Sequence, residues 1–264
     1  MYETFTRAVG WDEHVPEPNS MVLITDTGKS DGTFLFLQIL AATLLNGNCR
    51  KGKKVGVRLD GMKEAGEFVF IDGLTEMSEI SRLKKFHLYD SGNLSTTMKP
   101  NEIAKGLSSN VGVLEFVQKM MDTILRAVGG EVETLGTIFI HGISTLVDLG
   151  ISAGCVRQFI DTLREILEQN GGFLVLLTDL DDDILGELEE TDEYPTLIRG
   201  LLYRAELVIQ VEPLSSGHSS EVTGQTSIYS QAYYKSQIPG PKLLFYKTLD
   251  NKTNFFAPGQ QSVR

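Results

Sequence analysis

Short apolar runs alternate with longer stretches of helical period along most of the chain. Apolar runs of about four to eight residues are typical of buried strands, whereas apolar residues about three or four positions apart are typical of helices. We therefore expect strands at 21–26, 53–59, 68–71, 135–140 and 173–177, and helices at 33–46, 113–128, 155–169 and 194–203. This alternation favours a mostly parallel central sheet with helices on both faces.

The last third of the chain has a different pattern. Short apolar stretches at 206–211, 225–229, 242–247 and 254–257 follow one another without a long helix between them, and the last two are joined by a hairpin-like connection at 249–252. We expect an α/β fold whose sheet ends in a C-terminal antiparallel meander, which matches the RecA-like version of the phosphate-loop fold in outline. The expected organisation is an N-terminal extension at 1–20 and a single domain at 21–264.

Two of the expected elements are unusual. The helix at 33–46 is apolar nearly all round, so we expect it to be buried on more than one side, by its own sheet and by a neighbouring subunit. The strands that end at Leu59 and begin at Phe68 are separated by only eight residues, whereas a parallel crossover needs about a dozen or more. Either these strands pair antiparallel, or the usual crossover helix is missing from this sequence.

The turn after the first strand contains Gly28-Lys29-Ser30, which resembles the end of a phosphate-binding loop. The full motif is G-x-x-x-x-G-K-[ST], and its lysine lies at the start of the following helix, where it reaches the phosphates. When Ser30 is taken as the last residue of the motif, the first glycine position falls at Leu23, inside the strand. No room is left for a loop, so this alignment fails.

The other alignment takes Thr33 as the last residue and gives a loop of the right length. Both glycine positions are then aspartates, Asp26 and Asp31, and the lysine position is Gly32. Asp31 would repel a phosphate, because two unit charges about 4 Å apart repel by about 4 kcal/mol at an effective dielectric constant of about 20. We therefore predict a vestigial loop in which the glycines serve the turn and Ser30 or Asp31 caps the helix.

A magnesium-binding acid at the end of a strand would complete a nucleotide site. The strand at 135–140 is followed by His141, and imidazole is a poor substitute for an oxygen ligand of Mg²⁺. We expect His141 to be a hydrogen-bonded residue at the edge of the sheet. The strand at 173–177 does lead to Asp179, but it comes one helix too late in the chain, and the acidic loop at 181–183 is typical of a solvated loop. We predict no catalytic residue, no metal site and no cofactor.

Composition limits the classes of partner. The 24 basic and 35 acidic residues give a net charge of −11, which disfavours nucleic-acid binding by the chain alone, because affinity for polyanions comes mainly from cations. No apolar run approaches the roughly 20 residues of a membrane span. Cys49 and Cys155 form neither a CxxC motif nor a disulfide framework. We expect an intracellular protein, cytoplasmic with the nucleus as a second compartment, that does not bind membranes.

Three stretches carry a family resemblance. They are 22–45, with its strand, aspartate-glycine turn and helix; 207–229, with Glu212-Pro213-Leu214-Ser215-Ser216-Gly217 followed by Gly224-Gln225; and 245–259, with the terminal hairpin. Together they resemble the family of the sixth subunit of the Elongator complex, and the middle stretch is the most specific. The chain departs from the family pattern in the short connection between Leu59 and Phe68 and at His141, where that family tends to carry Asp.

The resemblance implies a RecA-like fold without intact nucleotide-binding motifs and no enzymatic activity of its own. It implies a hetero-hexameric ring with Elongator subunits 4 and 5, in two copies each, which joins the catalytic Elongator subcomplex and supports tRNA binding and wobble uridine (U34) modification. By analogy, the helix at 33–46 and the meander after Glu206 would face neighbouring subunits. The expected interface residues are Glu212, Pro213, Leu214, Gly217, Gly224 and Gln225.

Two other functions fit parts of the sequence. An ATPase of the recombinase or circadian-clock kind, with a divergent phosphate loop, would use Gly28-Lys29-Ser30. Binding of MgATP that is lost in Lys29→Ala would support it. A module that binds tRNA by itself is the other alternative, and the net charge of −11 opposes it.

Overall fold

The computed structural model describes residues 2–11, 15–45, 53–58, 67–71, 135–148, 151–180, 192–217, 219–230, 242–249 and 252–260. The helices are α1 (Tyr2–Val9), α2 (Thr33–Leu45), α6 (Thr145–Asp148), α7 (Ala153–Gln169) and α9 (Glu193–Arg204). The strands are β1 (Met21–Asp26), β2 (Lys53–Arg58), β3 (Glu67–Ile71), β4 (Leu135–His141), β5 (Phe173–Asp179), β6 (Leu207–Glu212), β7 (Gly224–Ser230), β8 (Lys242–Leu249) and β9 (Lys252–Phe256).

The strands form one mixed sheet in the order β3-β2-β4-β5-β1-β6-β7-β8-β9. The adjacent strands β2, β4, β5, β1 and β6 run parallel. The pairings β2–β3, β6–β7, β7–β8 and β8–β9 are antiparallel. The α/β class and the C-terminal meander are thus confirmed, whereas a mostly parallel arrangement holds for the centre of the sheet and not for the whole of it.

The short connection after β2 is explained by the pairing of β2 with β3. These strands pair antiparallel, from Lys54 opposite Ile71 to Arg58 opposite Glu67. An antiparallel pair needs no crossover helix, so the first of the two explanations offered for the eight-residue spacing is correct. The predicted helix at 113–128 lies outside the described residues, and so does the acidic loop at 181–183.

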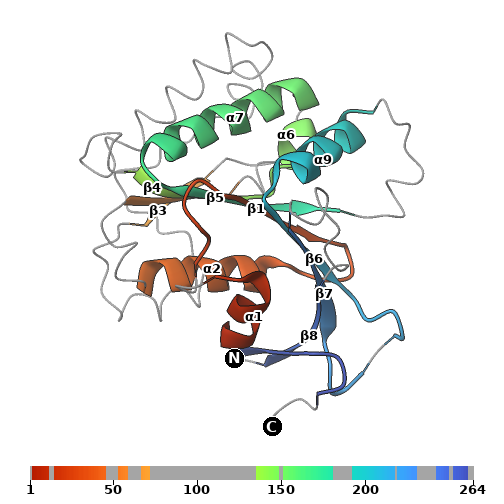
Figure 1. Ribbon diagram of the computed structural model, residues 1–264. Helices are drawn as coiled ribbons and strands as arrows, with labels where there is room; N and C mark the ends of the chain where they lie inside the picture. Colours follow the sequence, from red (N-terminus) through yellow and green to blue (C-terminus); the bar gives the residue numbers. More distant parts are fainter. Residues whose placement is uncertain are drawn as a thin grey trace.

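Helices cover both faces of the central strands (Figure 1). On one face lie α6, α7 and α9, and on the other lie α1 and α2; the meander strands curve out of the central plane toward α1. Two hydrophobic clusters follow this division, one beneath α7 and α9 and one around α2. The helix that follows β1 therefore lies on one face of the sheet, and α9, the next described helix after β5, lies on the other.

Helix α2 is buried on two sides by its own chain. Phe36 packs edge-to-face on Phe139 of β4, with 5.5 Å between ring centroids. Phe34 packs against the meander instead, 4.8 Å from the ring of Tyr246 and 6.2 Å from that of Phe255. The central strands and the meander thus account for the nearly uniform apolar character of this helix. Contact with a neighbouring subunit stays a prediction.

The N-terminal segment contributes to the same core. Helix α1, which the sequence pattern did not reveal, packs against β9 and places Phe5 in the cluster around α2. The Phe5 ring lies 5.1 Å from that of Phe255 and 5.8 Å from that of Trp11. Residues 2–11 are therefore not a free arm, although the division of the chain at residue 20 stays a prediction.

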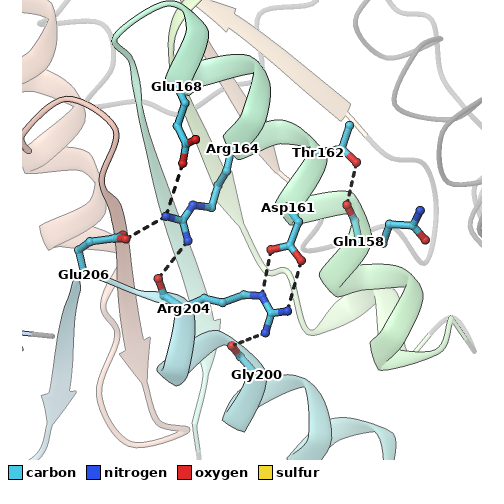
Figure 2. Close-up of polar contacts among 8 residues, drawn as sticks. All are labelled: Gln158, Asp161, Thr162, Arg164, Glu168, Gly200, Arg204 and Glu206. Carbon is cyan, nitrogen blue, oxygen red and sulfur yellow. Dashed lines mark hydrogen bonds and ion pairs between the residues drawn. The ribbon is translucent and has the colours of Figure 1, made fainter. Parts of the chain in front are cut away.

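A polar network joins α7 and α9 to the beginnings of β1 and β6 (Figure 2). Arg204 makes a two-point ion pair with Asp161, at 2.9 and 3.3 Å. Arg164 donates to the backbone oxygen of Arg204 at 3.1 Å and to Glu206 at 2.9 Å. The second carboxylate oxygen of Glu206 accepts from the backbone N–H of Met21, at 2.6 Å. The network fixes where β1 starts relative to the helices above it.

Arg164→Ala should lower the free energy of unfolding by about 1–2 kcal/mol, because it leaves Glu206 and the last turn of α9 without their charged donor. Arg164→Lys should lose less, since it keeps the charge but cannot reach both acceptors as a fork. Urea denaturation measures both variants. Arg7→Ala, on the exposed side of α1, is the control and should change the stability by less than about 0.5 kcal/mol. Equal stability of Arg164→Ala and this control would rule out a role for the network.

Candidate functional site

The candidate site lies where β1 ends and α2 begins. The carboxyl ends of β1, β5 and β4 bring Asp26, Asp179 and His141 to one edge of the sheet, and Thr33 opens the helix at the same place. The helices α2 and α9, which follow β1 and β5 among the described residues, lie on opposite faces of the sheet. Open α/β sheets bind ligands in the crevice at such a switch point.

The turn at 27–30 is closed by its own hydrogen bonds. The backbone N–H of Thr27 donates to the oxygen of Ser30 at 3.2 Å, and the N–H of Ser30 donates back to Thr27 at 3.0 Å. The N–H of Lys29 donates to the side-chain oxygen of Thr27, at 3.3 Å. Three amides of the segment therefore have partners inside the turn, and the backbone does not wrap around a bound anion as a phosphate loop does.

Asp31 and Ser30 have different roles at the start of α2. Asp31 Oδ1 accepts from the backbone N–H of Thr33, the first residue of α2, at 2.8 Å, so Asp31 rather than Ser30 satisfies an amide at this helix start. The hydroxyl of Ser30 donates to the backbone oxygen of Val211 in β6, at 2.6 Å. Since this bond uses the hydroxyl hydrogen of Ser30, Thr27 must be the donor in the 3.0 Å contact between the two hydroxyls.

The amide of Gly32 is taken by a carboxylate of the same chain. Asp26 Oδ2 accepts from the N–H of Gly32 at 2.7 Å, and Asp26 is only 9% exposed. A Cβ atom at position 32 would lie 3.0 Å from Leu177 Cδ1 and 3.2 Å from Asp26 Oδ2. Position 32, which carries lysine in the motif, therefore has no room for a side chain. Glycine at this position allows the Asp26 carboxyl to lie close to the backbone.

Asp26 has an unusual electrostatic environment. It lies directly opposite Asp179 in the pairing of β1 with β5. Burial raises the pKa of Asp26 to about 7; the N–H of Gly32 lowers it, and the neighbouring carboxyls of Asp179 and Asp31 raise it further. Burial together with Asp31 and Asp26 also raises the pKa of Tyr246 to about 12. This end of the sheet therefore resists additional negative charge.

His141 is a hydrogen-bonded residue at the end of β4, as predicted. Its Nε2 lies 3.0 Å from the hydroxyl of Thr33, and its ring packs edge-to-face on Phe36, at 5.6 Å. Thr33 is the one residue of the motif that the second alignment retains. Its hydroxyl, which would face Mg²⁺ in a working loop, contacts an imidazole here.

The predicted interface residues lie next to this site. Glu212 ends β6 and lies opposite Gln225 in β7; its carboxylate accepts from Gln225 at 3.4 Å and from the hydroxyl of Ser227 at 3.2 Å. Ser30 bonds Val211, the residue before Glu212. The residues of the predicted vestigial loop and those of the predicted interface therefore lie next to each other.

The other residues predicted to form an interface lie in the loop after β6 and at the start of β7. Pro213 is exposed and Leu214 half-buried; the N–H of Gly217 donates to the oxygen of Leu214 at 3.0 Å, and Gly217 has a φ of +90° that favours glycine. A Cβ on Gly224 would lie 2.6 Å from the backbone oxygen of Glu212. The geometry gives these residues local structural roles, and a contact with another subunit stays a prediction.

The proximity of Asp26 and Asp179 was missed, although the sequence carries a signal for it. Both residues follow a threonine at the end of an apolar run, in Thr25-Asp26 and Thr178-Asp179. Two parallel strands with the same ending place those endings side by side when they are neighbours in the sheet. The shared Thr-Asp ending was not sufficient, because hydrophobic periodicity does not reveal which strands are neighbours in the sheet.

Within the part of the chain that the structure describes, no group of three or more His, Cys, Asp or Glu side chains could hold a metal ion. No described helix is both long and apolar enough to pass through a bilayer.

Comparison with known proteins identifies the family. A family model described as Elongation complex protein 6 matches residues 8–250. The chain belongs to this family. It is 25% identical to Elongator complex protein 6 of Mus musculus over 264 aligned residues, and the match covers 92% of each chain. The Homo sapiens protein of that name is also 25% identical, and the Rattus norvegicus one 26%, with the same coverage. The resemblance drawn from three stretches is thereby confirmed over most of the chain.

Proposed function

We propose that this chain is a non-catalytic structural subunit of the Elongator complex. Membership of the Elongation complex protein 6 family supports a role in that complex. The observation that carries the non-catalytic part is the bond from the Gly32 amide to Asp26, because a carboxylate of the chain occupies the position that a bound phosphate would need. A lysine at position 32 would also require Leu177 and Asp26 to move.

The detailed proposal is a RecA-like subunit with degenerate nucleotide-binding motifs in a hetero-hexameric ring. Its neighbours are Elongator subunits 4 and 5, in two copies each, and the ring joins the catalytic subcomplex. A parallel core covered on both faces and extended by a meander supports the fold assignment. The net charge of −11 supports tRNA binding by the assembled ring rather than by this chain alone. We propose the cytoplasm, and also the nucleus, as its location.

The assembly is tested by purifying the chain alone and with subunits 4 and 5, and by measuring mass with light scattering. The expected result is one species that contains two copies of each subunit. A chain that stays monomeric in the presence of both partners would contradict the proposal. Leu214→Asp, in the loop after β6, should reduce the fraction assembled while leaving the circular dichroism of the isolated chain unchanged. Tyr203→Asp, on the outer side of α9 where Tyr203 is 86% exposed, is the matched control and should assemble normally.

The ATPase alternative is tested on the same preparation. Calorimetry with MgATP should detect no binding to the isolated chain, because the amides of Thr27, Lys29, Ser30 and Gly32 already donate to oxygens of the same chain. Micromolar binding that disappears in Lys29→Ala would instead assign Gly28-Lys29-Ser30 a phosphate-binding role.

A further inference from the structure

The C-terminal meander has an outer face that no described helix covers. Leu244 and Tyr246 of β8 belong to the hydrophobic cluster around α2, and successive side chains along a strand point to opposite faces of the sheet. Figure 1 shows α1 and α2 on the inner side of the meander, and α6, α7 and α9 over the central strands. The alternate residues of β8 therefore lie on the outer face, and they are Leu243, Phe245, Lys247 and Leu249.

The strand register extends this outer face across the neighbouring strands. Phe245 lies opposite Phe256 of β9 and opposite Gln225 of β7, and the two phenylalanine rings are 6.0 Å apart. Gln225 in turn lies opposite Glu212 of β6. Residues directly opposite one another share a face of the sheet, so one row of side chains runs from β9 to β6. The row ends at Glu212, where the loop with the predicted interface residues begins.

The outer face presents accessible apolar side chains. Leu243 is 37% exposed and Leu249 is 39% exposed, and Phe245 between them is half-buried. Among the described residues three large apolar side chains are exposed, and two of the three lie on this face. An exposed apolar strip with polar residues beside it is typical of a contact with another protein. The most exposed side chains are aliphatic, which favours a protein over single-stranded nucleic acid, since bases stack on aromatic rings.

The charge of these two strands is opposite to that of the whole chain. β8 and β9 contain three lysines, Lys242, Lys247 and Lys252, and no acidic residue, whereas the chain has a net charge of −11. Lys252 is exposed and lies opposite Leu249, so it shares the outer face. A second copy of this chain would bring the same lysines together, because a two-fold contact uses the same patch on both copies. The charge therefore favours a different protein with carboxylates beside an apolar surface.

We propose that the outer face of the meander contacts one neighbouring subunit of the ring, through an apolar surface of that neighbour bordered by carboxylates. This inference rests on the proposed function. A subunit of a closed ring made of different chains has two different sides, and the outer face belongs to one of them. The same contact includes the loop after β6, because the row of side chains on the outer face is continuous with Glu212 and Gln225.

Leu243→Asp combined with Leu249→Asp tests the contact. The full chain is mixed with subunits 4 and 5, and the mass is measured by light scattering. A ring with two copies of each subunit, related by rotation about its axis, repeats every third position. Loss of one side of this chain in both copies divides the ring into two open arcs with one copy of each subunit, so the mass should fall by about half. Tyr203→Asp, the same kind of change on α9, is the control and should keep the full mass.

Lys252→Glu tests the charge and leaves the apolar strip intact. It should weaken assembly about tenfold at low salt and less at high salt, because salt screens the contact with carboxylates. Failure of the wild-type chain to assemble would contradict the proposed function itself. Normal assembly of both the leucine and the lysine variants, or a leucine variant that stays monomeric, would overturn this inference alone. Salt-sensitive binding of the isolated chain to a single-stranded RNA oligonucleotide, lost in Lys252→Glu, would also overturn it and assign the face to nucleic acid.

Discussion

Phe5→Ala is expected to lower the free energy of unfolding by about 3–5 kcal/mol, the usual cost of removing a buried aromatic ring. The Phe5 side chain is 0% exposed and contacts the rings of Trp11 and Phe255. Its removal should leave a cavity between α1 and β9. The rings of Trp11 and Phe255 belong to separate segments that make other packing contacts, so they cannot both move in to fill it. Denaturation by urea, followed by circular dichroism and by the fluorescence of the single Trp11, measures the loss.

Glu3→Ala is the matched control for this prediction. Glu3 lies on the same helix but is exposed, so its removal should change the stability by less than about 0.5 kcal/mol. In Phe5→Ala both signals should move to lower urea together. A shift of the fluorescence transition alone would mean that α1 docks and undocks separately, and that its packing does not stabilise the sheet.

Gly224→Ala is expected to cost about 3 kcal/mol, near the upper end of the usual range for overpacking. The added Cβ would lie 2.5 Å from the hydroxyl of Tyr246 and 2.6 Å from the backbone oxygen of Glu212. The tyrosine ring is buried against Phe34, and the oxygen belongs to a paired strand, so neither neighbour can move cheaply. Thermal denaturation of the variant measures the cost.

Two variants separate the contributions at this position. Gly28→Ala is the control, since a Cβ there meets no atom within 4 Å, and it should be close to neutral. Tyr246→Phe combined with Gly224→Ala should recover only part of the loss, because the contacts with the Glu212 oxygen, at 2.6 Å, and with the ring carbon Cζ, at 2.7 Å, remain. Full recovery in the double variant would show that the tyrosine hydroxyl alone makes glycine necessary.

Strand and helix positions were largely predictable because each repeats a simple period. Residues 21–26 form β1 with the predicted bounds, and α2, α7 and α9 begin within two residues of their predicted starts. The eight residues of α1 were missed, although Phe5, Ala8 and Val9 lie at helical spacing and pack in the cluster around α2, because two turns are too short for a period to stand out in the sequence. The burial of Phe5 depends on Phe255, which lies near the other end of the sequence.

The sequence showed which phosphate-loop residues are absent from the turn after β1, but not which contacts the turn makes instead. Alignment of the motif with Asp26, Asp31 and Gly32 needs only the length of the turn, so it was evident from the sequence that this turn does not carry the lysine and glycines of the motif. The bond from Gly32 to Asp26 requires a closed turn of known shape. The pairing of Asp26 with Asp179 requires β5 to lie beside β1, although β2, β3 and β4 come between them in the chain.

The sequence by itself determined the order and type of the main elements, the family and the absence of a standard phosphate loop, because these depend on residue type and local spacing. Only the tertiary structure decided that the meander covers one side of α2, that α1 is part of the core, and that two carboxyls meet at the end of β1. Those features arise from contacts between segments distant in the chain, whose partners are selected by strand order and packing rather than by any local pattern.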